Sequence, residues 1–288
     1  MKVLVTGAAG QLGRTIVERL SGAHAVVPAN VADLDVRDHA AVQAKLAELR
    51  PDAIVNCAAY TDVDGSEDHP VEALAVNAFA VRSLASAART VGAALVHYST
   101  DFVFDGRSDR PYVEEDEPNP RSTYACSKLL GEWMAAGAER HYVLRVESLF
   151  GARGLPGEAP RTSVDRIVGA IRSGAPVRVF VDRTVSPSYT LDVAGATAWL
   201  LEQRVPSGLY HCVNSGHCTW ADLAVEAARQ LGIEAQLVPV RLTDAGLRAE
   251  RPLYCALSNR KLLDAGFAMR TWQAALAHHL SGRLTGSR

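Results

Sequence analysis

Short apolar runs and longer amphipathic stretches alternate along the first half of the chain. Residues 2–6, 53–57, 94–98 and 141–146 are short runs rich in valine, leucine and other strand-forming residues. Between them lie stretches in which apolar residues recur every three to four positions, as on one face of a helix. Buried strands that alternate with such helices build a parallel sheet covered on both faces. The pattern therefore predicts an α/β fold with a Rossmann-type, doubly wound parallel sheet.

The alternation weakens after residue 151, and glycine and proline recur from Arg153 to Arg161. Beyond this stretch we expect a helix near 163–173, a strand at 177–181 and the last strand of the main sheet at 208–213. A chain of 288 residues is long enough for one large domain with a smaller one beside it. No internal repeat is visible.

A glycine-rich turn follows the first run. Gly7, Gly10 and Gly13 lie between residues 2–6 and an amphipathic stretch that predicts a helix. Glycine allows a tight turn and a close approach of backbone to phosphate, and the N-terminus of the helix presents unpaired N–H groups to it. A glycine pattern alone is a weak signal, but the strand before it and the helix after it predict dinucleotide binding.

The sequence leaves the choice of dinucleotide open. The carboxylate that would bind an adenosine ribose should end the second strand, but Ala29 and Asn30 stand there, and the nearest acid is Asp33. No carboxylate in that turn repels a 2′-phosphate, and no arginine in it attracts one. We therefore expect either NADH or NADPH to bind, with modest discrimination between them.

Two further strands end in residues suited to a ligand at the carboxyl edge of a parallel sheet. Ala58 and Ala59 follow residues 53–57, and small residues there allow either a close cofactor or only a tight turn. Thr100 and Asp101 follow residues 94–98, and the Thr100 hydroxyl is able to donate a hydrogen bond to a substrate oxygen.

Tyr124 and Lys128 are four residues apart in a segment that Ser122 or Thr123 is placed to cap as a helix. The phenol and the ammonium then lie one turn apart on one face. A cation beside a phenol favours the phenolate and lowers its pKa, which makes Tyr124 a usable general acid. A solvent-facing helix gives the same spacing without any chemistry, so this interpretation depends on the other motifs.

A long helix predicted over residues 70–91 carries Asn77 on a mostly apolar face, where a buried amide needs hydrogen-bond partners. Either it satisfies a backbone group between strands, or it helps to hold Lys128 through a water molecule.

Composition excludes several classes of partner. The chain has 30 basic and 32 acidic residues, and no basic block that would bind nucleic acid. The apolar start has no charged lead-in, and we expect no apolar run to reach the length that spans a membrane, so we expect neither a signal peptide nor a membrane protein. The five scattered cysteines predict reduced thiols, no disulfide and a cytoplasmic location.

The pairs His211-Cys212 and His217-Cys218 raise the question of a metal site. Adjacent His-Cys pairs do not have the spacing of zinc ligands, and alternation along a strand sends His211 and Cys212 to opposite faces. We therefore predict no metal.

Several motifs in combination resemble those of the extended short-chain dehydrogenases/reductases, and within that group those of the dTDP-4-dehydrorhamnose reductases. The resemblance covers nearly the whole chain. It rests on residues 6–13, 33–36, 56–64 and 99–106, on Tyr124 and Lys128 followed by Gly131-Glu132, and on 186–189, Arg251-Pro252 and Lys261-Leu262.

The resemblance implies reduction of the C4 keto group of a dTDP-4-keto-6-deoxyhexose, a nucleotide-diphosphate sugar, by NADPH or NADH in a monomer or homodimer. It implies that residues 1–150 bind the cofactor, that later segments such as 189–213 return to that domain, and that residues 151–288 form mainly a smaller substrate-binding lobe. The implied catalytic residues are Thr100, Tyr124 and Lys128. The implied cofactor contacts are Gly7, Gly10, Gln11, Leu12, Gly13, Asp33, Leu34, Ala58, Ala59, Tyr60, Tyr124 and Lys128, and the implied substrate contacts are Thr100, Asp101, Tyr124 and Ser148.

Two positions depart from the pattern of that family. Ser148 stands where a tryptophan usually lines the sugar pocket, and Gly65 stands where a lysine is common. The first departure leaves the identity of the sugar open.

Two other functions fit the same fold. One is a non-catalytic regulatory subunit, against which the intact set Thr100, Tyr124 and Lys128 argues. The other is a nucleotide-sugar epimerase or dehydratase. A dehydratase needs a carboxylate pair beside the hydroxyl, whereas Thr100-Asp101 offers only one acid.

Overall fold

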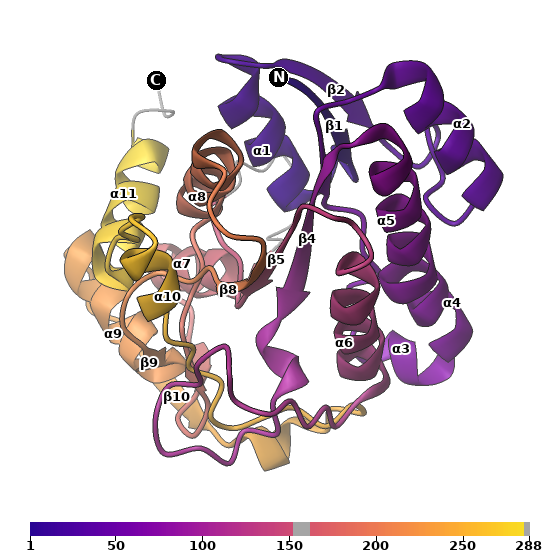
Figure 1. Cartoon of the computed structure of the whole chain (residues 1–288). Coiled ribbons are helices and arrows are strands. Elements are labelled where there is room, and N and C mark those ends of the chain that lie inside the picture. Colours follow the sequence, from indigo (N-terminus) through magenta and orange to yellow (C-terminus); the bar gives the residue numbers. More distant parts are fainter. Residues whose placement is uncertain (152–161, 285–288) are drawn as a thin grey trace.

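A six-stranded parallel sheet forms the centre of the molecule, which a computed structural model describes for residues 1–151 and 162–284 (Figure 1). The spatial order is β2-β1-β3-β4-β5-β8, and each strand is parallel to its neighbours. The chain runs from β1 to β2 on one side and returns to β3 on the other, which opens a crevice at the carboxyl ends of β1 and β3. The predicted fold class is confirmed. The strands are β1 (Lys2–Thr6), β2 (Ala25–Ala29), β3 (Ala53–Asn56), β4 (Ala94–Thr100), β5 (His141–Val146) and β8 (Gly208–His211).

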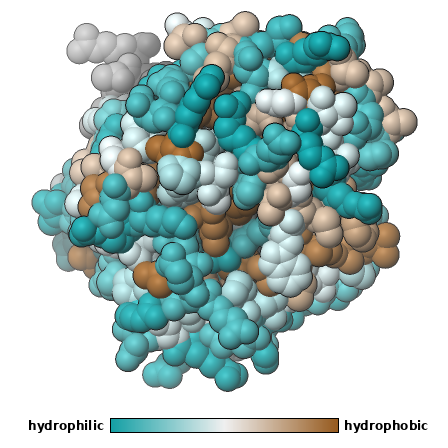
Figure 2. All heavy atoms as spheres, viewed as in Figure 1, coloured by the Kyte–Doolittle hydropathy of each residue, from teal (hydrophilic) through white to brown (hydrophobic). Residues whose placement is uncertain are grey.

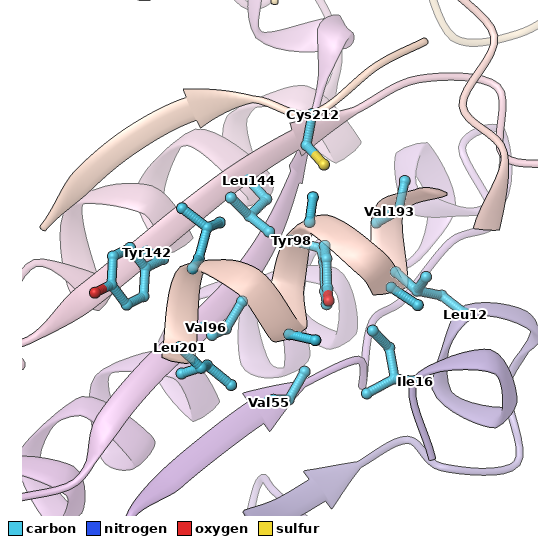
Figure 3. Close-up of a cluster of buried hydrophobic side chains, with 14 of the residues drawn as sticks. Leu12, Ile16, Val55, Val96, Tyr98, Tyr142, Leu144, Val193, Leu201 and Cys212 are labelled. Carbon is cyan, nitrogen blue, oxygen red and sulfur yellow. The ribbon is translucent and has the colours of Figure 1, made fainter. Parts of the chain in front are cut away.

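Helices cover both faces of this sheet because successive strand residues point to opposite sides. On β1, Val3 and Val5 belong to one buried cluster and Leu4 to another. The first cluster lies under α1 (Gln11–Ser21) and α8 (Thr190–Gln203), which contribute side chains such as Leu12 and Leu201 (Figure 3). The second cluster lies under α2 (His39–Leu49), α5 (Ala80–Val91) and α6 (Thr123–Ala135). Burial on both faces explains why the strands read as continuous apolar runs.

Most of the chain after residue 151 forms a smaller unit with its own buried cluster, in which Trp220 and Trp272 pack together with helix side chains. Within this unit β6 and β10 pair in parallel and β7 and β9 pair antiparallel. Its elements are α7 (Ser163–Ser173), β6 (Val177–Phe180), β7 (Thr184–Val185), β9 (Cys218–Thr219), α9 (Trp220–Leu231), β10 (Leu237–Val240), the 3₁₀ helix η3 (Leu242–Ala245) and α11 (Trp272–Leu284). The short helix α10 (Arg260–Asp264) instead packs against the main sheet through Leu262. The glycine- and proline-rich stretch 153–161 lies outside the described residues.

The helix predicted over residues 70–91 is not uniform. It consists of α4 (Pro70–Leu74), a π-helical turn η1 (Ala75–Phe79) and α5. By length and composition Pro70–Val91 is the one described helix that passes the test for a membrane span, so the expectation that nothing in the sequence is long and apolar enough is wrong for this helix. Of its most apolar window, 56% is buried inside the protein, as in a core helix.

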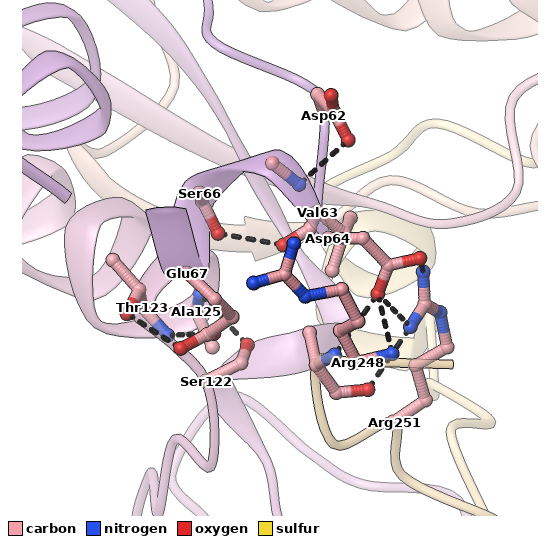
Figure 4. A network of polar contacts seen from close by, with 12 residues as sticks. Asp62, Val63, Asp64, Ser66, Glu67, Ser122, Thr123, Ala125, Arg248 and Arg251 are labelled. Atoms are coloured by element: carbon pink, nitrogen blue, oxygen red, sulfur yellow. Dashed lines mark hydrogen bonds and ion pairs between the residues drawn. The ribbon is translucent and has the colours of Figure 1, made fainter. Parts of the chain in front are cut away.

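A polar network ties the sheet domain to the later part of the chain (Figure 4). Asp64, just before α3 (Gly65–Asp68), accepts hydrogen bonds from Arg251 at 2.8 and 3.0 Å and from the Ala249 N–H at 2.9 Å. Arg248 forms an ion pair with Asp68. The Arg251 guanidinium is the main reason why the pKa of Asp64 is lowered to about 2. We call Asp64, Asp68, Arg248 and Arg251 the Asp64 network.

Candidate active site

The glycine turn lies against the end of β3. Gly7 adopts φ +63°, and a Cβ at this position would lie 2.5 Å from the Ala58 nitrogen. A Cβ on Gly13 would lie 2.2 Å from the Gly7 oxygen, so only glycine lets α1 begin this close to the turn. The helix has no side-chain cap and no acidic residue in its first turn. Its first N–H groups are therefore available to a phosphate.

Asn30 supports this turn, which the sequence did not reveal. Its side-chain oxygen accepts a hydrogen bond from the Ala9 N–H at 2.7 Å, and Asp33 in turn accepts one from the Asn30 N–H at 2.9 Å. Leu34 is buried in the core between the sheet and α2. The expected adenosine-binding turn is thus a hydrogen-bonded structure that ties the end of β2 to the glycine turn.

Asn77 organises the segment that follows β3. Its amide accepts a hydrogen bond from the Tyr60 N–H at 2.9 Å and donates to the Tyr60 carbonyl at 3.0 Å. It also donates to the Ser127 hydroxyl at 3.0 Å, one residue before Lys128. This buried amide was expected either to satisfy a backbone group or to help hold Lys128 through a water molecule. In the structure it satisfies the backbone of Tyr60. Asn77 joins residues 58–60 to α6 directly.

Two elements bring Thr100, Tyr124 and Lys128 to the carboxyl edge of the sheet. Thr100 is the last residue of β4, and the other two lie in the first turns of α6. The Ser122 hydroxyl caps α6 by accepting from the Ala125 N–H. A carboxylate of α3 reinforces this end of the helix, because Glu67 accepts hydrogen bonds from the Thr123 N–H and hydroxyl (Figure 4).

The electrostatics of the pair differ from the expectation. The Lys128 ammonium is buried and donates a hydrogen bond to the Tyr98 carbonyl, and burial lowers its pKa to about 8. The pKa of Tyr124 is raised, first by burial and then by the negative charge of Asp101, while a hydrogen bond with Thr100 lowers it. The prediction that Lys128 lowers the pKa of the Tyr124 phenol is therefore wrong for this structure, in which that pKa is raised. Burial outweighs the cation because a phenolate loses more solvation than a phenol does.

A buried charged cluster lies directly behind Thr100. Asp101 accepts a hydrogen bond from the Thr100 hydroxyl at 2.9 Å, and its other oxygen lies 3.7 Å from Arg183 Nη2. The same nitrogen lies 3.6 Å from the Cys255 sulfur. Polar ligand atoms of Asp101, Glu147 and Cys255 lie within 4.8 Å of one another. We call Asp101, Glu147, Arg183 and Cys255 the Arg183 cluster.

The comparisons with known proteins agree on one family. The sequence model of the family described as "RmlD substrate binding domain" matches residues 1–284. The chain belongs to this family. It is 38% identical to a dTDP-4-dehydrorhamnose reductase of Streptomyces griseus, over 95% of this chain and 91% of that protein.

Two further relatives carry different names, one a 4-ketoreductase and the other a dTDP-4-dehydrorhamnose reductase. A probable dTDP-4,6-dihydroxy-2-methyloxan-3-one 4-ketoreductase of Streptomyces antibioticus is also 38% identical, over 96% of this chain and 93% of the relative. A crystal structure of a Bacillus anthracis dTDP-4-dehydrorhamnose reductase in complex with NADP is 30% identical with a TM-score of 0.90, and covers 98% of this chain and 99% of its own.

In this member of the RmlD family, the Arg183 cluster corrects one sequence-based argument. Glu147 places a second carboxyl group beside Asp101, so the statement that only one acid accompanies Thr100 is wrong. No local pattern predicts this cluster, because its members come from four distant segments of the chain. Ser148, the expected substrate contact, follows Glu147 with a half-buried side chain and φ +46°.

A cavity of about 410 Å³ lies between α7 and β6, with Arg183 in its wall. Arg183 therefore connects this cavity to Asp101 and, through it, to Thr100. The surface in Figure 2 is mostly hydrophilic, with hydrophobic atoms in a recess near its middle. The cavity combines three arginines with two aromatic side chains. Its lining residues are Ser163, Arg166, Ile167, Ala170, Pro176, Val177, Arg178, Val179, Phe180, Arg183 and Trp220.

Of the residues considered for a metal, His211, Cys212 and Cys218 are buried and His217 is exposed. His211 lies 3.2 Å from the Ser258 carbonyl and 3.4 Å from Arg145, and burial lowers its pKa to about 3. Cys212 points into the apolar cluster under α8 (Figure 3). All five cysteines are free. Among residues 1–151 and 162–284, the one group of potential metal ligands is in the Arg183 cluster, where a guanidinium already supplies the positive charge.

Proposed function

We propose that this protein reduces the C4 keto group of a dTDP-linked 4-keto-6-deoxyhexose. The observation that carries the proposal is the meeting of Thr100, Tyr124 and Lys128 at the sheet edge next to an uncapped glycine turn. The names of the relatives in Streptomyces griseus and Streptomyces antibioticus support the substrate class. The NADP complex of the Bacillus anthracis relative supports the cofactor.

NADPH or NADH, when bound, supplies the hydride that the carbonyl carbon accepts. Tyr124 gives its phenolic proton to the carbonyl oxygen, and a raised pKa keeps that proton on the phenol until negative charge develops on the substrate. Thr100 stabilises the same oxygen by hydrogen bonding. Lys128 supplies a buried positive charge and binds the cofactor ribose. The glycine turn and the first turn of α1 hold the diphosphate.

The cavity between α7 and β6 is the proposed site of the nucleotide part of the sugar substrate. Arg166 and Arg178 offer positive charge to a diphosphate, and Phe180 and Trp220 offer aromatic surface to a base. Arg183 lies at the end that leads to the catalytic residues. Ser148, in place of a tryptophan, leaves a smaller and more polar wall near the sugar. We expect this difference to widen the range of sugars rather than to change the reaction.

The first test is the variant Tyr124→Phe, assayed with NADPH and a dTDP-4-keto-6-deoxyhexose. We expect kcat to fall by about 10²–10⁴, the usual contribution of a positioned acid, with unchanged cofactor affinity. Tyr142→Phe is the matched control, because Tyr142 is a buried tyrosine whose hydroxyl bonds to the Val205 carbonyl, away from the site. If Tyr124→Phe turns over as fast as this control, Tyr124 is not the acid. If the wild type oxidises NADPH with no such sugar, the proposed substrate class is wrong.

A further inference from the structure

Asp101 and Glu147, which we call the acid pair, are 3% and 1% exposed. Arg183 is the one fully charged cation among the described neighbours. The other titratable groups that face the acid pair are Tyr124, Tyr254, Cys218 and Cys255. All four are neutral when protonated. Two buried carboxylates beside one guanidinium leave an excess negative charge, which is costly at low dielectric. One bound proton removes that excess.

The hydrogen bonds show where such a proton fits. Asp101 uses one oxygen to accept from Thr100, and Glu147 uses one to accept from the Ser186 N–H at 2.6 Å. The other oxygen of each, Asp101 Oδ2 and Glu147 Oε1, is buried without a hydrogen-bond partner. Both unpartnered atoms accept only, so they need a donor. A proton on one of the two carboxyl groups turns an acceptor into a donor, and polar atoms of the pair lie within 4.8 Å of each other.

Burial and mutual repulsion act in the same direction. Burial raises the pKa of Asp101 and of Glu147, and the charge of Asp101 raises the pKa of Glu147 further. These shifts favour a state in which the pair holds one proton, and the titration belongs to both groups together. Arg183 prevents the alternative, a metal ion, because it brings its own positive charge to within 3.7 Å of Asp101.

Thr100 connects the acid pair to the catalytic tyrosine. Its hydroxyl donates to Asp101 at 2.9 Å, and its hydrogen bond with Tyr124 lowers the pKa of the phenol. We propose that the acid pair stores the proton that returns to Tyr124 after each reduction, and that this proton passes through the Thr100 hydroxyl. The inference rests on the proposed reduction, which consumes one proton from solvent in each turnover.

The steps balance as follows. Tyr124 loses its proton to the substrate oxygen and becomes a phenolate. The phenolate takes the hydroxyl proton of Thr100 when that hydroxyl turns from Asp101 to Tyr124, and the Thr100 oxygen takes a proton from Asp101, the member of the acid pair that it contacts. The pair, now doubly ionised beside Arg183, regains a proton from solvent through the cavity that Arg183 lines. Asp101 and Glu147 are therefore positioning residues that act through Thr100 and Tyr124.

Glu147→Gln tests the proposal, because glutamine keeps the size and the acceptor for Ser186 but does not store the proton. In stopped-flow assays with NADPH and sugar, we expect the first turnover to stay within about twofold of wild type and later turnovers to slow about tenfold or more. The variant then shows a burst of one equivalent. Glu147→Asp, which retains a carboxyl group, should lose the burst.

Glu114→Gln is the matched control, because Glu114 also accepts from a backbone N–H, that of His211 at 2.7 Å, far from Tyr124. We expect no burst from it. A Glu147→Gln enzyme without a burst, or with its first turnover slowed as much as later ones, would overturn the proposal.

Infrared difference spectroscopy gives a readout that does not depend on turnover or on any variant's activity. Titrating wild type across neutral pH should reveal a protonated carboxyl band that loses intensity as pH rises. The band should be missing in Glu147→Gln and present in Glu114→Gln. A wild-type protein without this band disproves the stored proton, whereas a wild type with the band but without ketone reduction refutes only the proposed function.

Discussion

Burial decides the chemistry of the single residues at the site. The spacing of Tyr124 and Lys128 predicts that the two share a face, and α6 places both in its first turns. It does not reveal that Lys128 bonds to the Tyr98 carbonyl or that Asp101 raises the pKa of the phenol. Those effects depend on residues brought in by β4. Sequence spacing therefore predicts which groups meet, and burial sets their proton affinities.

The lowered pKa of Lys128 has a measurable result. Its ammonium is expected to lose its proton as pH rises through about 8, well below the ordinary value of 10.5. If the charge is needed for cofactor binding and for the developing alkoxide, kcat/KM falls above that pH. We expect an alkaline limb with an apparent pKa of about 8 in the profile of kcat/KM against pH.

Lys45→Met is the matched control for Lys128→Met, because Lys45 is a partly exposed residue of α2 paired with Glu48. The control should retain the alkaline limb, while Lys128→Met should lose both the limb and most of the activity. A limb that stays near pH 10 in the wild type would show that Lys128 is not titrating at the site.

At the scale of elements, local signals predict where helices begin better than how they continue. Asp38, Ser122 and Thr219 each accept a hydrogen bond from an N–H of the helix that they precede. The π-helical turn around Asn77 has no such signal, because its cause is the pair of bonds to Tyr60, which approaches from another segment. A turn of this kind commonly marks a functional site.

The contact between the glycine turn and α1 predicts the effect of Gly13→Ala. The new Cβ would meet the Gly7 oxygen at 2.2 Å, so the turn or the helix has to move. We expect a loss of about 1–3 kcal/mol in the free energy of unfolding, the scale of overpacking. Affinity for NADPH should weaken with it, because the same atoms shape the phosphate site. Urea denaturation and NADPH titration measure the two effects.

Gly22→Ala is the control on the same helix. Gly22 has a helical φ of −70°, and its added Cβ would meet nothing within 4 Å. This variant should keep or slightly raise stability, by up to about 1 kcal/mol, because alanine restricts the unfolded chain. Equal NADPH affinities for Gly13→Ala and Gly22→Ala would contradict the role of the Gly13 contact.

At the scale of the whole molecule, long-range polar contacts escaped prediction. The fold class and the positions of Thr100, Tyr124 and Lys128 at the ends of their strand and helix follow from patterns that are local in sequence. The Arg183 cluster does not, because Glu147 and Arg183 lie in segments that show no periodicity or motif of their own. The Asp64 network also escapes prediction, because its acids and its arginines lie far apart in the sequence.

The Asp64 network predicts a pH-dependent contribution to stability. The pKa of Asp64 is lowered from 3.8 to about 2, so its stabilising effect is fully present above about pH 4 and is lost as pH falls through 2. The Asp64 side chain is 33% exposed, so solvent screening reduces the contribution of the ion pair to stability. We expect Asp64→Asn to lower the free energy of unfolding by about 1–2 kcal/mol at pH 7.

Denaturant unfolding of wild type and variant at pH 7 and near pH 2 measures this contribution, and the difference should shrink in acid. Asp35→Asn is the control, because Asp35 pairs only with nearby Arg37 on the surface. It should change stability by less than about 0.5 kcal/mol. A loss from Asp64→Asn that is the same at both pH values would exclude the ion pair as its source.

The return of α8 and β8 to the sheet has a consequence for synthesis on the ribosome. When residue 146 has emerged, β5 is still an open edge and the apolar side of α1 is bare, because β8 and α8 are encoded later. At about 5–20 residues per second, several seconds pass before residue 211 follows. During that interval the nascent chain exposes an unpaired strand edge, the surface on which chains aggregate. A fragment ending at residue 150 lacks β8 and α8, so we expect it to keep this edge and the apolar side of α1 exposed.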